Sequence, residues 1–290
     1  MPRVRSNGIE LEYLTAGDPT DPAIVLINGF TSQLIEWHDE FCELLTAQEL
    51  FVIRFDNRDC GLSTHLHGEP DITALLEGDL STMAYRLEDM AEDVIGLLDA
   101  LDIAAAHLAG VSMGGMIAQL VAIHHPDRTL SLCSIMSGTG DLAQLAPDPE
   151  ASAALLQPTP TSREQASSQA VSSARVSISP RYLDEQRIAD EAMAKFDRNH
   201  DPGGDMRQVA AIAIAADRSP QLAQLRLPTL VIHGDFDPMI VLSAGEATAD
   251  AVPEAELLVI EDMGHYLSEE FWPEITRAIA ANARRAAAAR

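Results

Sequence analysis

The sequence has 290 residues, of which 47% are hydrophobic, and its formal net charge is −26. This length is enough for one large α/β domain with an insertion. The strong negative charge would repel nucleic acids and anionic membranes, so we expect neither as a partner. No apolar run reaches the roughly 18 residues that a membrane-spanning helix needs.

Two further features favour a cytoplasmic location. The basic N-terminal residues, Met1 to Ser6, are not followed by the apolar stretch of a secretory signal peptide. The cysteines Cys42, Cys60 and Cys133 form no C-x-x-C pair and no disulfide framework, which suits a reducing compartment. We expect each of them to be a small packed residue rather than a nucleophile or a metal ligand.

In chain order, short apolar segments predict the strands of a sheet. Asn7-Gly8 precedes an alternating stretch from Ile9 to Tyr13, which is typical of a hairpin at the start of a sheet. Continuous apolar segments are typical of strands buried on both faces. The expected buried strands are Ala23 to Ile27, Phe51 to Phe55, Ile103 to Leu108, Leu130 to Met136, Leu230 to His233 and Leu257 to Ile260.

Helical periodicity occupies the intervals between these strands. The pattern predicts helices over Ile35 to Ala47, Leu87 to Leu101, from Ser112 onward, and from about Ser268 into the C-terminal tail. Strands that alternate with helices indicate a mostly parallel sheet that is covered on both faces. The sequence therefore predicts an α/β fold.

The alternation stops between residues 140 and 218, where no buried strand is predicted. Helical patterns cover Tyr182 to Phe196 and Met206 to Ala216. We expect residues 1–139 and 219–290 to form the core domain, and residues 140–218 to form a helical cap over the carboxyl edge of the sheet. For residues 159–179, which are rich in Ser and Ala, a disordered linker is the alternative.

The motif Gly110-Val111-Ser112-Met113-Gly114 lies where a strand changes to a helix. Such a turn exposes the serine hydroxyl, and glycines on either side allow the strained backbone to form without a clash. The N-terminus of the following helix offers free N–H groups to a developing anion. Ser112 is therefore the candidate nucleophile, although a glycine-rich turn with an incidental serine is the simpler alternative.

A serine nucleophile needs a histidine base and a carboxylate that orients it. His265 follows the predicted strand Leu257 to Ile260 and a glycine, and it is the candidate base. The loop after Leu230 to His233 contains Asp235 and Asp237. We favour Asp237, which precedes a proline, as the orienting carboxylate, and Asp235 stays open as the alternative.

Two backbone N–H groups are needed to bind the oxyanion. We assign one to Met113, at the start of the helix, and the other to Phe30, in the loop that follows the first buried strand. Residues that could line the substrate pocket also pack well in a core, and this second interpretation stays open for each of them. These candidates are Phe30, Trp37, Met136, Met239, Ile240 and Tyr266.

Together, these motifs resemble the α/β-hydrolase fold superfamily over nearly the whole chain. The segments Trp37 to Phe41, Arg54 to Ser63 and Val111 to Gly115 are similar to those of bacterial esterases near the aclacinomycin methylesterases. This resemblance implies an eight-stranded, mostly parallel sheet and a helical cap. Two positions depart from the usual pattern: Asn28 stands where many relatives have His, and Asp59 stands where they have Gly.

The leading hypothesis is a carboxylesterase that cleaves a small-molecule ester through an acyl-enzyme, with Ser112, His265 and Asp237 as its triad. This chemistry implies no metal and no organic cofactor. The same triad serves cofactor-free perhydrolases, lactonases and carbon–carbon bond hydrolases, so the reaction subtype is open. A non-catalytic small-ligand binding protein is the alternative of a different class. The sequence leaves open whether the protein is a homo-oligomer.

Overall fold

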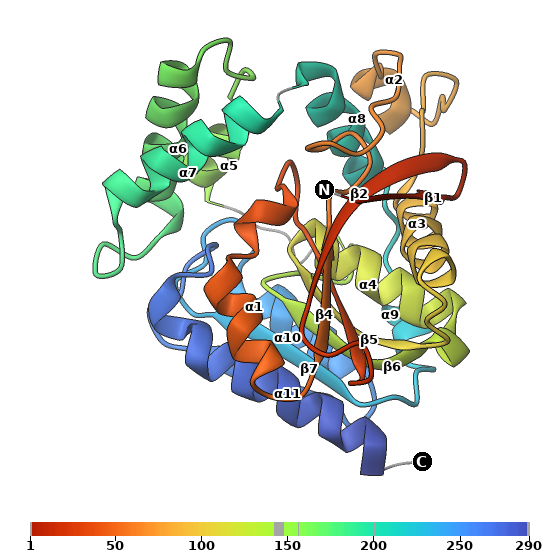
Figure 1. Cartoon of the computed structure of the whole chain (residues 1–290). Coiled ribbons are helices and arrows are strands. Elements are labelled where there is room, and N and C mark those ends of the chain that lie inside the picture. The colour runs from red at the N-terminus through yellow and green to blue at the C-terminus, as the bar shows by residue number, and fades with distance from the viewer. Residues whose placement is uncertain (1, 142–147, 156, 200, 289–290) are drawn as a thin grey trace.

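The computed structural model describes residues 2–141, 148–155, 157–199 and 201–288 (Figure 1). Within these residues, eight strands form one sheet in the order β1-β2-β4-β3-β5-β6-β7-β8. The strands are β1 (Arg3–Ser6), β2 (Ile9–Ala16), β3 (Ala23–Ile27), β4 (Phe51–Phe55), β5 (Ala106–Val111), β6 (Thr129–Ile135), β7 (Thr229–Gly234) and β8 (Glu256–Ile260).

The sheet is mostly parallel, as predicted. Strands β4, β3, β5, β6, β7 and β8 pair in parallel, whereas β1 and β2 form an antiparallel hairpin whose second strand pairs with β4. The carboxyl ends of parallel strands lie at one edge of a sheet, where ligands of open α/β folds bind. The loops after β3, β5, β7 and β8 therefore meet at this edge.

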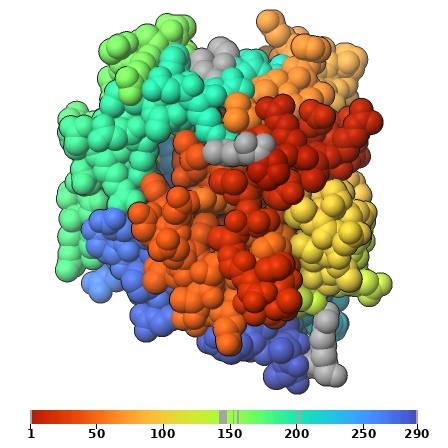
Figure 2. Space-filling model, in the orientation of Figure 1, coloured from red at the N-terminus to blue at the C-terminus, as the bar shows by residue number. Residues whose placement is uncertain are grey.

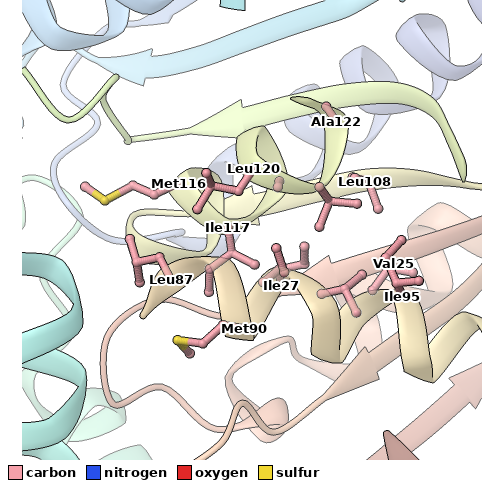
Figure 3. Close-up of a cluster of buried hydrophobic side chains, with 14 of the residues drawn as sticks. Val25, Ile27, Leu87, Met90, Ile95, Leu108, Met116, Ile117, Leu120 and Ala122 are labelled. Carbon is pink, nitrogen blue, oxygen red and sulfur yellow. The ribbon is translucent and has the colours of Figure 1, made fainter. Parts of the chain in front are cut away.

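Helices cover both faces of the sheet (Figure 1). On one face lie α3 (Leu87–Ala100), α4 (Met113–His124), α9 (Ser219–Leu222) and α10 (Leu242–Ala251), and on the other lie α1 (Asp39–Thr46) and α11 (Trp272–Ala288). Figure 3 shows the first face, where apolar residues of α3 and α4 meet those of β3 and β5. These include Val25, Ile27, Leu87, Met90, Ile95, Leu108, Met116, Ile117 and Leu120.

In the described part of the chain, four helices lie between β6 and α9: α5 (Pro149–Leu155), α6 (Arg163–Ser177), α7 (Glu185–Arg198) and α8 (Pro202–Ala213). Figure 1 shows α5 to α8 above the carboxyl edge of the sheet, and Figure 2 shows α7 and α8 packed against the N-terminal part of the chain. The Ser162 hydroxyl accepts a hydrogen bond from the Gln165 N–H and caps α6. Residues 159–179, for which a disordered linker was the alternative, are thus largely helical.

Several predicted elements have different limits in the structure. The helices predicted over Tyr182 to Phe196 and Met206 to Ala216 are α7 and α8, which begin and end at other residues. The strand predicted over Ile103 to Leu108 is β5 and begins later, because the Ile103 N–H still bonds to the Leu98 carbonyl at the end of α3. The helix predicted over Ile35 to Ala47 is interrupted. A short 3₁₀ helix, Leu34–Glu36, ends at Trp37, whose carbonyl accepts a hydrogen bond from the Arg54 guanidinium in β4.

A five-residue helix, α2 (Ile72–Leu76), was not predicted, because it is too short to show a helical period. None of the described helices is long and apolar enough to cross a membrane.

Candidate active site

Ser112 lies on the turn between β5 and α4. Its backbone has φ 54° and ψ −120°, a conformation that costs energy for a residue with a Cβ and that persists only where the surroundings enforce it. The Ser112 N–H donates to the Ile135 carbonyl of β6 at 2.9 Å, and the Ser137 hydroxyl donates to the Ser112 carbonyl at 2.8 Å. These bonds hold the turn at the carboxyl edge of the sheet.

The glycines of the motif are required by close packing. A Cβ on Gly110 would lie 2.1 Å from the Gly114 carbonyl oxygen, and one on Gly114 would lie 2.1 Å from the Ile27 carbonyl oxygen. Both contacts are with backbone atoms, which cannot move aside without disturbing β3 or α4. The sequence motif therefore has a steric origin in the crossing of α4 over β3 and β5.

The structure brings the ring of His265 to the Ser112 hydroxyl. His265 Nε2 lies 3.1 Å from Ser112 Oγ, although 153 residues separate the two positions. The backbone N–H of His265 donates to the Ser177 carbonyl at 2.8 Å. A Cβ on Gly264 would lie 2.0 Å from that same oxygen. The end of α6 therefore helps to position the loop that carries His265.

Of the two candidate carboxylates, the structure places Asp237 against His265. Asp237 Oδ2 lies 2.7 Å from His265 Nδ1, and Oδ1 accepts the N–H groups of Met239 and Ile240 at 2.9 and 3.0 Å. The Asp237 side chain is fully buried. Asp235 is exposed and accepts the Asp262 N–H at 2.7 Å, so it braces the neighbouring loop instead.

The loop after β3 lies directly against the serine turn. A Cβ on Gly29 would be 3.2 Å from the Val111 carbonyl oxygen and 3.4 Å from Ser112 Cβ. Phe30, the next residue, borders the same cavity as Ser112 and Met113. The two N–H groups assigned to the oxyanion thus belong to two segments that both lie next to the serine.

The two departures from the usual family pattern have structural roles. The Asn28 side-chain amide donates to the Phe55 backbone carbonyl at 3.0 Å. The Asn28 backbone carbonyl accepts from the Asn57 side-chain amide at 3.0 Å, so Asn28 braces the loop after β3. Asp59 keeps the left-handed conformation that favours glycine, with φ 63°. Its carboxylate is held by Arg207 of α8 and by the Leu66 N–H.

A cavity of about 690 Å³ lies between the serine turn and the helices α5 to α8. Every predicted pocket residue borders it, and the lining is mainly apolar. Its core-side lining includes Phe30, Trp37, Val111, Met116, Met136, Met239, Ile240, Tyr266 and Leu267, and its helical lining includes Ala151, Ala154, Ala170, Val209, Ile212 and Ala213. A ligand in this cavity would lie against Ser112 and His265.

One side of the cavity is polar, and the sequence did not indicate it. The Tyr266 hydroxyl donates to Glu191 Oε2 at 2.7 Å, and His38 Nε2 lies 3.2 Å from Glu191 Oε1. Lys195 Nζ lies 3.4 Å from Glu36 Oε2. Glu191 and Lys195 are four residues apart on α7, which is a helical spacing, but two charged residues at this spacing are typical of a solvated face.

Burial raises the pKa of Glu191, but hydrogen bonds from His38, Arg187 and Tyr266 outweigh this effect and lower it. Glu191 is therefore ionised near neutral pH. Burial also raises the pKa of the Tyr266 hydroxyl, and the Glu191 charge raises it further, so Tyr266 stays a neutral donor.

Within the described part of the chain, one group could offer three ligand atoms to a metal ion. The ligand atoms of Asp59, His65 and Asp201 lie within 4.8 Å of one another. The Arg207 guanidinium already donates to Asp59 at 2.8 and 2.9 Å and to Asp201 at 3.1 Å. Because this fixed cation neutralises the carboxylates, the group fits a junction between α8 and the core better than a metal centre.

A sheet of this order, with a serine on the strand-to-helix turn after β5, is typical of α/β hydrolases. The family model of the α/β hydrolase fold matches residues 22–271, and the chain belongs to this family.

Similarity to individual proteins extends over nearly the whole chain. Rhodomycin D methylesterase DauP from a Streptomyces species is 28% identical over 93% of this chain and 93% of its own length. 3-Oxoadipate enol-lactonase 2 from Acinetobacter baylyi is 28% identical over 87% of this chain and 85% of its own. The solved structure of an enol-lactonase from Burkholderia xenovorans has a TM-score of 0.76 at 25% identity, with coverage of 97% and 99%.

Proposed function

We propose that this protein is a carboxylic ester hydrolase that works through an acyl-enzyme formed on Ser112. The observation that carries this proposal is the position of His265, which lies between the Ser112 hydroxyl and the buried Asp237 carboxylate. The similarity to a methylesterase and to enol-lactonases, all named for cleaving ester bonds, supports the same reaction class.

In the proposed mechanism, His265 Nδ1–H donates to Asp237, which leaves Nε2 free to accept the Ser112 proton. Ser112 Oγ then attacks the ester carbonyl, and the N–H groups of Phe30 and Met113 bind the oxyanion. The protonated His265 returns the proton to the departing alcohol. A water molecule, deprotonated by His265, releases the acid and restores the Ser112 hydroxyl. These steps use no metal and no organic cofactor.

We further propose that residues 140–218 form a cap on a core made of residues 1–139 and 219–290. Four helices of this segment supply about a third of the residues that line the cavity, which supports a role in substrate selection. The expected partner is a small-molecule ester, and the strong negative charge disfavours nucleic acids and anionic membranes. We also propose a cytoplasmic location, and whether the protein forms homo-oligomers is left to direct measurement.

A lactone is the second candidate substrate, because two of the similar proteins are named as enol-lactonases. Perhydrolysis and carbon–carbon bond hydrolysis could use the same three side chains. A panel of esters varied in acyl and alcohol length, together with a lactone and a peroxide-coupled assay, separates these reactions by kcat/KM. The highest value identifies the subtype.

The proposal predicts that Ser112→Ala lowers kcat/KM for a short-chain nitrophenyl ester by roughly 10⁴-fold or more. A fluorophosphonate probe should label the wild type on Ser112, as located by mass spectrometry, and should not label the variant. The exposed Ser168 on α6 provides a matched control, and Ser168→Ala should keep full activity and labelling. Equal low rates in wild type and Ser112→Ala would instead favour a binding protein.

A further inference from the structure

The helix α8 contacts the loop after β3 through one buried side chain, Gln208. Gln208 is 1% exposed. Its Oε1 accepts the Thr31 N–H at 2.8 Å, and its Nε2 donates to the Arg58 carbonyl at 2.9 Å. A single amide thus joins α8 to two core loops that lie 177 and 150 residues away in the sequence.

The bond to Thr31 acts on the peptide that directly follows Phe30. Thr31 has φ 57°, a left-handed conformation that is strained for a β-branched residue. Such a conformation persists where neighbouring contacts enforce it. Its N–H is bound by Gln208, and its carbonyl lies 3.2 Å from the Cys60 thiol. These two contacts fix the peptide planes on either side of Thr31. The Ser32 N–H also donates to the Gly29 carbonyl at 3.3 Å, and this carbonyl belongs to the same peptide as the Phe30 N–H. The turn that Gln208 braces at Thr31 therefore also sets where the Phe30 N–H points.

The same helix also borders the cavity. Val209, Ile212 and Ala213 line it, and Val209 directly follows Gln208. A substrate that packs against this face of α8 therefore contacts the helix that holds the Phe30 loop.

We propose that Gln208 is a positioning residue for the oxyanion-binding loop. This inference rests on the ester hydrolase proposed above. Removal of a direct oxyanion donor lowers kcat by about 10²- to 10³-fold. Because the Phe30 N–H itself remains in a Gln208 variant, we expect a smaller loss, about 10-fold or more, in kcat.

A purely structural role for Gln208 would give a different result. Arg207, the preceding residue, is also buried and anchors α8 to the core through Asp59, but it does not contact Thr31. If Gln208 only docked the helix, a change at Arg207 would affect kcat to a similar extent. Arg207→Lys, which keeps the charge and loses the paired bonds, is therefore the matched control.

The test compares Gln208→Met with Gln208→Glu. Met has a similar length and offers no acceptor, so kcat should fall about 10-fold or more with little change in KM. A buried Glu is favoured in its neutral form, in which one oxygen accepts the Thr31 N–H and the O–H donates to the Arg58 carbonyl, so this variant should retain kcat within about 3-fold. Arg207→Lys should also retain kcat. Wild-type kcat in Gln208→Met, or equal losses in the Met and Glu variants, would overturn the proposal.

A transition-state analogue provides a readout that helix docking alone would not change. A trifluoromethyl ketone forms an adduct with a serine hydroxyl that carries an oxyanion, so its Ki for Gln208→Met should rise by the same factor as kcat/KM falls. An unchanged Ki would contradict the proposal. Circular dichroism checks folding. If the Met variant does not fold, Gln208→Asn, which is one methylene shorter, should show the same loss in kcat and the same rise in Ki.

Different results would contradict the proposed ester hydrolase activity and the proposed role of Gln208. If wild type and Ser112→Ala are equally slow, the ester hydrolase proposal is wrong. If Ser112→Ala is inactive while Gln208→Met and Gln208→Asn turn over at the wild-type rate, only the role of Gln208 is wrong.

Discussion

At the scale of single residues, both oxygens of the Asp237 carboxylate are engaged in hydrogen bonds. One oxygen accepts two backbone N–H groups, and the other contacts His265 Nδ1. A carboxylate held in this way orients the imidazole and stabilises its protonated form. Asp235, two residues earlier, is exposed and has only a loop-bracing bond.

Asp237→Asn should therefore lower kcat by about 10⁴-fold, because an amide in this place favours the wrong imidazole tautomer. Asp235→Asn is the matched control and should change kcat by less than about 3-fold. Initial rates with the same nitrophenyl ester measure both. The assignment within the loop is reversed if Asp235→Asn abolishes turnover and Asp237→Asn leaves it intact.

At the scale of elements, buried ion pairs join the inserted helices to the core. The Arg207–Asp59 pair links α8 to the loop after β4, and both side chains are almost completely buried. The Arg198–Asp56 pair links the end of α7 to the same loop. A buried pair fixes the relative position of two elements, because breaking it leaves a charge without a partner in a medium of low polarity.

Arg207→Met should lower the free energy of unfolding by about 3–5 kcal/mol, since it leaves the Asp59 carboxylate buried and unpaired. Arg175→Met provides the comparison. Arg175 pairs with Glu185 across α6 and α7, but both side chains are exposed, and such pairs contribute less than about 1 kcal/mol. Urea unfolding followed by circular dichroism measures both. Similar losses would show that the buried junction has no special role in stability.

At the scale of the whole molecule, stability should depend on pH through His233, at the end of β7. Burial lowers the pKa of His233 below its ordinary value of 6.5, and it outweighs the favourable charge of Asp237. The ring bonds to the Ile240 carbonyl at 2.7 Å, and its Nδ1 has no hydrogen-bond partner among the described residues. Protonation would bury a second N–H without an acceptor.

Because the folded-state pKa is lowered, the unfolded chain binds more protons below about pH 6.5. The free energy of unfolding should therefore fall as pH decreases from 7 to 5, by at most about 1.4 kcal/mol per pH unit from this one group. His233→Gln removes the titrating ring and should flatten the slope. Urea unfolding at several pH values compares the two proteins, and identical slopes would exclude His233 as the cause.

Short-range patterns were sufficient to predict the sheet and the three side chains at Ser112. Buried strands are continuous apolar segments, and in a parallel sheet their carboxyl ends meet at one edge, so a serine, an aspartate and a histidine that follow three such strands must come close together. The structure brings together Ser112, Asp237 and His265 for this reason. Limits that depend on a single distant contact, such as the interruption at Trp37, were not predictable from periodicity.

The way in which the inserted helices meet this edge depends on tertiary contacts. Gln208, Glu191 and Lys195 carry no signal in the sequence, because a polar residue on a helix is typically solvated. Their partners lie far away along the chain, in the loop after β3 and in the loop beside His265. The buried strands and the placement of Ser112 at the edge of the sheet thus follow from local periodicity and steric rules. The depth, polarity and bracing of the cavity depend on long-range contacts.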